Sequence, residues 1–164
     1  MANELLETLD KLVKLHEGLL TVTERKAVTL KERDTDSLQK LLKQEKTYIT
    51  AINTVEQQRQ KEACQLFQKA GQSIDTPTLD QCMDAVSDPS LKDKLQQKKD
   101  ELLIVIKALS QKNELNQQLT YQSLQFVNMT MELIMPKKNT MNYSNKQGTP
   151  NQARPNRSIF DSRT

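Results

Sequence analysis

The sequence contains few of the residues that bend a chain. Its 164 residues include three glycines, five prolines and no tryptophan, and only 4% of them are aromatic. Proline removes a backbone donor and clashes inside a helix, so long helices form where proline is absent. Three long proline-free stretches, roughly 3–32, 36–70 and 89–135, carry apolar residues at helical spacing. We therefore predict three long helices.

Large side chains are also scarce, which argues against a compact core. Hydrophobic residues make up 35% of the chain, and an elongated bundle with a thin apolar seam fits this composition better than a globular core. The predicted fold is all-α: an elongated antiparallel bundle of three long helices with a short connector helix, over residues 1–135.

Catalytic and metal-binding residue types are nearly missing. The chain has two cysteines, Cys64 and Cys82, and one histidine, His16, which falls on the apolar stripe of the first helix. No second base accompanies the histidine, no glycine-rich loop is present, and no cluster has metal-ligand spacing. The sequence therefore predicts neither an enzyme nor a cofactor or metal site, and both cysteines are expected to be reduced and structural.

Long hydrophobic runs are absent as well. No apolar run approaches the ~18 residues of a membrane-spanning helix. The N-terminus lacks a basic start followed by an apolar stretch, so we expect no secretory signal, no membrane insertion and a cytoplasmic location.

The apolar stripes that are present contain polar interruptions. In the second stretch, residues spaced by three and four form a coiled-coil seam on which Glu45, Arg59 and Glu62 also fall. The third stretch is apolar in its first half, turns polar at Asn113 and Asn116, and then becomes apolar again. Its far end carries Phe126, Val127, Leu133, Ile134 and three methionines, Met129, Met131 and Met135.

Helix-start signals separate these stretches. Asp34 or Asp36 can cap the second helix. Thr76-Pro77 and Asp88-Pro89 are start signals with proline at the first helical position, and they bracket the short connector helix.

Residues 136–164 differ in composition from the rest of the chain. They hold six Lys or Arg residues against Asp161 alone, with many Asn, Gln, Ser, Thr and Pro residues and no periodicity. We expect a flexible basic tail that is disordered when free. Its cations are spread thinly and accompany one Tyr and one Phe, so nucleic-acid binding is not predicted.

Four segments, taken in order, are similar to a known family. They are Glu56-Gln57-Gln58-Arg59, the short Thr-Pro-Thr-Leu-Asp helix from Thr76, Leu115-Asn116-Gln117-Gln118-Leu119, and the segment from Gln122 to Asn128. With these segments in this order, the sequence resembles the FlgN family of flagellar export chaperones over essentially its whole length. The resemblance implies a cytosolic helical protein that binds the C-terminal segment of the two hook–filament junction proteins. It also implies that the chaperone prevents premature assembly and delivers these subunits to the flagellar export gate.

We place the partner-binding residues on the second half of the third helix, where a partner's amphipathic C-terminal helix can pack. The predicted set is Asn116, Leu119, Ser123, Phe126, Val127, Met131 and Ile134. The resemblance further implies an export-gate contact through a tail tyrosine followed by small residues and glycine. Tyr143 and Gly148 match that segment, although the gap between them is longer and includes Lys146.

A second reading of the same stripes stays open. A structural coiled-coil protein that self-assembles through its helical seam would show a similar pattern, and a homodimer could complete the thin seam. The sequence does not decide between monomer and dimer, which junction protein is preferred, or whether the tail folds on binding.

Overall fold

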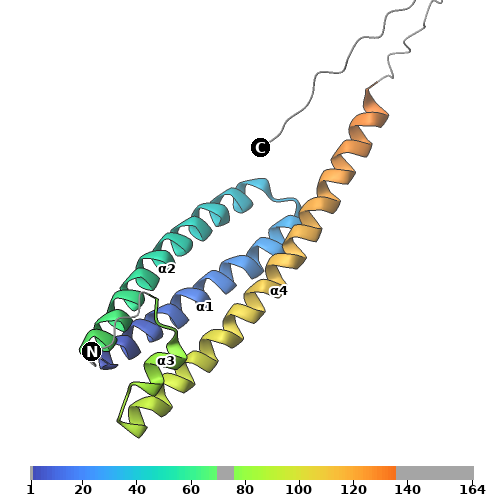
Figure 1. Ribbon diagram of the computed structural model, residues 1–164. Helices are drawn as coiled ribbons and strands as arrows, with labels where there is room; N and C mark the ends of the chain where they lie inside the picture. Colours follow the sequence, from blue (N-terminus) through green and yellow to red (C-terminus); the bar gives the residue numbers. More distant parts are fainter. Residues whose placement is uncertain (1, 70–75, 136–164) are drawn as a thin grey trace, which may run out of the picture.

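The structure is a computed structural model that describes residues 2–69 and 76–135, and in that part of the chain it contains helices and no strands. The helices are α1 (Ala2–Glu32), α2 (Thr35–Lys69), α3 (Leu79–Asp84) and α4 (Pro89–Ile134) (Figure 1). This confirms the all-α prediction of three long helices and one short connector. The predicted tail, 136–164, lies outside the described residues.

Helix α1 lies between α2 and α4 and packs against both (Figure 1). It runs parallel to α4 and antiparallel to α2. No Cα atom of α2 comes within 8 Å of a Cα atom of α4. The prediction of an antiparallel three-helix bundle is therefore confirmed for its helices. Its arrangement is not confirmed, because α1 and α4 are parallel and α2 does not pack on α4. The buried stripe of α1 is broad enough to contact two neighbouring helices. Its buried residues are Leu5, Thr8, Leu9, Leu12, Val13, Leu19, Val22, Thr23, Ala27 and Thr29.

The main core sits where α3 closes the gap between α2 and α4. Buried side chains from all four helices meet there: Leu5, Leu9, Leu12, Ala63, Phe67, Cys82, Met83 and Leu95. Helix α3 begins with a reciprocal capping box between Thr78 and Gln81. The predicted start at Thr76-Pro77 was therefore two residues early. The predicted start at Asp88-Pro89 is confirmed, since Asp88 caps α4.

The turn between α1 and α2 is tight. Arg33 adopts a left-handed backbone conformation, with φ of 58°. The amide of Asp34 donates to the carbonyl of Thr29 over 3.1 Å, which is the bond that ends a helix in a Schellman motif. The Asp34 carboxylate then accepts from the amide of Ser37 over 3.0 Å. Of the two predicted caps, Asp34 is the one that begins α2.

Helix α4 is longer than the helix it packs on. It has 46 residues and α1 has 31, which corresponds to lengths of about 69 Å and about 46 Å. Asn116 lies against Thr23 near the end of α1, and Phe126 lies against Arg33 in the turn. The rest of α4 continues past the other helices (Figure 1). None of the described helices is long and apolar enough to cross a membrane.

Candidate functional site

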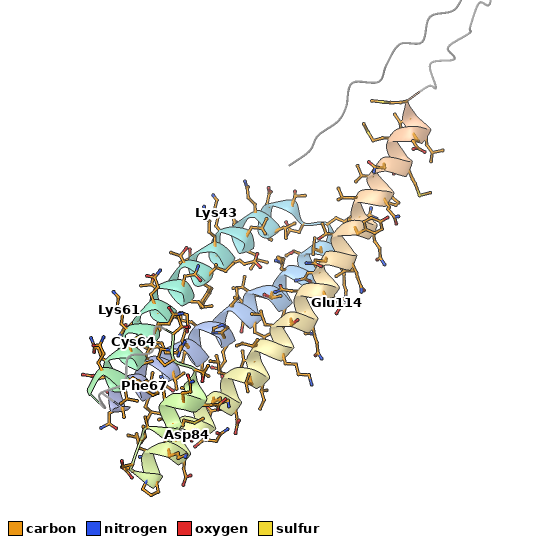
Figure 2. The ribbon with its side chains drawn as sticks, viewed as in Figure 1. Lys43, Lys61, Cys64, Phe67, Asp84 and Glu114 are labelled. Carbon is orange, nitrogen blue, oxygen red and sulfur yellow. The ribbon has the colours of Figure 1, made fainter. Side chains whose placement is uncertain are left out.

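The candidate site is the projecting segment of α4, which we define as residues 121–135. Figure 2 shows its side chains spreading from the helix with no other helix around its end. Nine large apolar side chains in this segment are exposed: Tyr121, Leu124, Phe126, Val127, Met129, Met131, Leu133, Ile134 and Met135. From Leu115 to Met135 the only charged residue is Glu132. A contiguous apolar surface of this kind marks an interaction site.

The exposure follows from the mismatch in helix length. Leu95, Leu102 and Leu109 are seven residues apart and face α1, and Leu95 is completely buried. Val127 comes 18 residues, or five helical turns, after Leu109, so Val127 and then Ile134 lie on the same side of α4, where they are 53% and 71% exposed. These residues occupy seam positions for which α1 has no residues left, because α1 ends at Glu32. Within residues 2–69 and 76–135, no second long helix covers these positions.

The seven predicted partner-binding residues divide into three groups by their exposure. Phe126, Val127, Met131 and Ile134 lie together on the projecting segment and are exposed. Leu119 and Ser123 are half-buried, and the Ser123 hydroxyl donates to the Leu119 carbonyl over 2.9 Å.

Asn116 differs from the rest of the set because it is buried against α1. Its side-chain amide donates to the carbonyl of Thr23, so we assign it to packing within the chain. The two predicted gate-contact residues, Tyr143 and Gly148, lie outside the described residues.

One side chain of the α1–α2 turn covers part of the candidate site. The guanidinium of Arg33 lies 4.1 Å from the centre of the Phe126 ring, which is cation–π geometry. Phe126 remains 50% exposed under this contact. Arg33 therefore covers one face of the projecting segment near its start.

A groove adjoins the projecting segment, between α2 and α4 over the end of α1. Its volume is about 630 Å³, and its apolar lining consists of Leu30, Leu38, Leu42, Tyr121 and Leu124. The sequence did not predict that α2 and α4 would leave this space open. We call it the α2–α4 groove.

The charged residues of the α2–α4 groove neutralise each other. The Lys26 ammonium donates to both carboxylate oxygens of Glu45, over 2.7 and 2.9 Å. Their side chains are only 14% and 17% exposed. The groove therefore presents no unpaired charge from this pair, and the rest of its polar lining is uncharged: Asn113, Asn116, Gln117 and Thr120.

The described residues hold no arrangement that suggests catalysis. No group of three or more His, Cys, Asp or Glu side chains among them could hold a metal ion. His16 is half-buried, and its Nδ1 lies 2.7 Å from the Leu12 carbonyl, as expected for a structural histidine. Burial raises the pKa of the Cys82 thiol, which makes it a poor nucleophile.

Comparison with known proteins gives one family and one relative. The family model described as "FlgN protein" matches residues 1–151. The chain is 36% identical over 143 residues to the "Uncharacterized protein YvyG" of Bacillus subtilis (strain 168), and the match covers 87% of this chain and 86% of that protein. No solved structure matches significantly.

Proposed function

This chain belongs to the FlgN family, and we propose that it is a cytoplasmic flagellar export chaperone for hook–filament junction proteins. In this proposal it binds their C-terminal helical region, prevents premature assembly and delivers them to the export gate. Its activity is binding and involves no catalysis or cofactor.

The observation that carries the proposal is the apolar, nearly uncharged projecting segment of α4. Leu124, Val127, Met131 and Ile134 follow one another by three and four residues, which gives one stripe along the helix. An amphipathic helix from another polypeptide can cover such a stripe. The methionines near the end of α4 suit a surface that must adapt to more than one client, because their side chains repack easily.

The chemistry of the stripe also suits a client that must be released. Phe126, Val127 and Met131 offer apolar contact, whereas Ser123 and Thr130 interrupt it with hydroxyls that are already bonded within α4. An interface of this mixed kind supports moderate affinity. Moderate affinity allows the client to be handed over at the gate.

The proposal assigns the gate contact to the tail. Tyr143 would contact the export gate while the projecting segment holds the client. Changing Tyr143 to Ala is therefore expected to leave client binding intact and to abolish gate contact.

The experiment that tests client binding is co-purification with a C-terminal fragment of a junction protein. The variant F126D/V127D should lose the fragment while its circular dichroism stays that of the wild type. A matched control is L103D/I104D. Leu103 and Ile104 are also exposed, at 53% and 70%, but they lie on the part of α4 that packs on α1. Fragment binding retained by F126D/V127D, or lost equally in the control, would reject the site.

A further inference from the structure

We infer that Asn116 is a specificity-determining residue for the client: its side-chain oxygen accepts a hydrogen bond from one uncharged donor side chain that a client helix places in the α2–α4 groove. The occupant is an apolar helix with an Asn, Gln, Ser, Thr or similar neutral donor at that position. The inference rests on the proposed function, since the client supplies the helix, and it adds the chemistry by which clients are selected.

Packing within the chain uses only half of the Asn116 side-chain amide. Its Nδ2 donates to the carbonyl oxygen of Thr23 over 2.9 Å. Because a carbonyl can only accept, this bond identifies the other amide atom as the oxygen. That Oδ1 is buried, and no donor among the described residues bonds to it. A buried acceptor without a partner is rare in folded proteins and calls for a specific explanation.

The unpaired oxygen belongs to a residue that lines the α2–α4 groove. The bond to Thr23 holds the nitrogen toward α1, so the oxygen is the amide atom left for a group in the groove. Thr120 also lines the groove, but its hydroxyl already donates to the main-chain carbonyl of Asn116 over 2.8 Å. Within the described residues the groove thus supplies no donor to Oδ1, and a side chain that enters the groove can.

The charges of the groove favour a neutral donor. Both carboxylate oxygens of Glu45 accept from Lys26, so a lysine or arginine that entered here would lose its hydration without a free carboxylate to pair with. An ionised aspartate or glutamate has no proton to donate. A purely apolar side chain would leave Oδ1 unpaired. Side chains with an uncharged N–H or O–H remain, because they satisfy the oxygen without bringing a charge.

The groove is continuous with the surface proposed for the client. Tyr121 and Leu124 line the groove and are also exposed residues of the projecting segment. Leu124 is the first residue of the proposed stripe, and Asn116 lies two turns before it, about 12 Å along the helix axis. A client helix that covers the stripe and extends this much further reaches Asn116. A single buried polar pair fixes the register of neighbouring helices, so this bond would set the position of the client along α4.

Fluorescence anisotropy of a labelled junction-protein C-terminal fragment, titrated with the full chain, tests the inference. N116L and N116A both remove the acceptor, and N116A does so without adding bulk. We expect each variant to bind the fragment about tenfold more weakly than the wild type, as for the loss of one buried hydrogen bond. Urea unfolding of N116L should show no loss of stability, which separates weaker binding from damage to the fold.

Asn113 supplies the matched control, because it is half-buried and lines the same groove three residues earlier. N113L should bind the fragment like the wild type. In the fragment, each Asn, Gln, Ser and Thr is changed in turn to Ala. One of these changes should weaken binding to the wild type about tenfold and have no further effect on N116L, which is the result expected of a direct pair in a double-mutant cycle.

The inference is overturned if N116L and N116A bind the fragment as tightly as the wild type, or if N113L weakens binding equally. It is also overturned if the effect of every fragment change adds to that of N116L. A wild type that does not bind the fragment at all is a different result, because it rejects the proposed function and the inference falls with it.

Discussion

Asn116 of α4 donates its side-chain amide to the carbonyl oxygen of Thr23 in α1, over 2.9 Å. The residue is 4% exposed, and its own Oδ1 has no hydrogen-bond partner. It follows Leu95, Leu102 and Leu109 at seven-residue spacing, so it is the polar end of the α1–α4 seam. A buried amide at such a position costs stability and fixes the register of two helices.

Two substitutions of Asn116 should shift stability in opposite directions. N116L replaces a half-satisfied amide with an apolar side chain, and we expect it to raise the free energy of unfolding by ~1 kcal/mol. N116D removes the donor and places a carboxylate beside the Thr23 carbonyl, which should lower that free energy by about 3 kcal/mol at pH 7. Urea unfolding measures both. Destabilisation by N116L would show that the amide contributes more than its bond to Thr23.

The contact between Arg33 and Phe126 can be separated from the backbone strain at Arg33. R33A loses the cation–π contact, worth about 0.5–1 kcal/mol at an exposed site, and keeps a side chain at a positive φ. R33G also loses the contact but relieves roughly 1 kcal/mol of left-handed strain. We therefore expect R33G to be more stable than R33A by thermal unfolding. Equal stability of the two variants would contradict the left-handed turn.

The ion pair between Lys26 and Glu45 explains why a glutamate falls on the predicted seam of α2. Both groups are largely buried, so removing one leaves the other charged and unpaired. K26M should lower the free energy of unfolding by about 3 kcal/mol, whereas K26M/E45L should recover most of that loss. Chemical denaturation of the single and double variants measures the coupling. If the loss of unfolding free energy in K26M/E45L equals the sum of the losses in K26M and in E45L, the ion pair contributes little.

Stability should fall in acid because several carboxylates are paired in the folded chain. Arg59 donates two hydrogen bonds to Glu56, over 2.8 and 2.7 Å, and lowers the pKa of that carboxyl below its ordinary 4.5. Hydrogen bonds from Lys14 and then Lys98 likewise lower the pKa of Asp10. A group with a lowered pKa binds fewer protons when folded, so its stabilisation is complete above the unfolded value and is lost as pH falls through the folded value.

The expected result is a free energy of unfolding that decreases as pH falls below ~4.5, which is near the unfolded pKa of glutamate. E56Q should be less stable than the wild type at pH 7, and its stability should decrease less steeply on acidification. Urea titrations at a series of pH values check this. Parallel pH profiles for E56Q and the wild type would show that Glu56 does not carry the effect.

Much of the helical layout could be predicted because it depends on local signals. Proline-free stretches with periodic apolar residues became α1, α2 and α4, and Asp88-Pro89 marked the start of α4 correctly. The capping box of α3 was missed because Thr76-Pro77 offered a competing signal two residues earlier. Helix starts depend on a few side chains, so two adjacent candidates are hard to separate from sequence alone.

The packing of the helices could not be predicted, because it depends on pairs of residues distant in sequence. Gly18 lies inside α1, and a Cβ atom there would lie 2.5 Å from the Tyr48 ring, so the glycine makes room for α2. The sequence assigned Asn116 to partner binding because it lies on the second half of the third predicted helix, where a partner helix was expected to pack. The length of α1 decides which residues of α4 are covered, and a stripe on α4 alone does not contain that information.

Helix α4 extends past α1, the long helix on which it packs, and we propose that another polypeptide covers the stripe that this leaves exposed. Amide hydrogen exchange of the full chain, with and without a junction-protein C-terminal fragment, tests it most directly. We predict that residues 121–134 exchange faster than residues 95–116 in the free chain and that the fragment slows exchange at 121–134. Slow exchange of that segment at all dilutions without any client, or protection by the fragment confined to other helices, would contradict it.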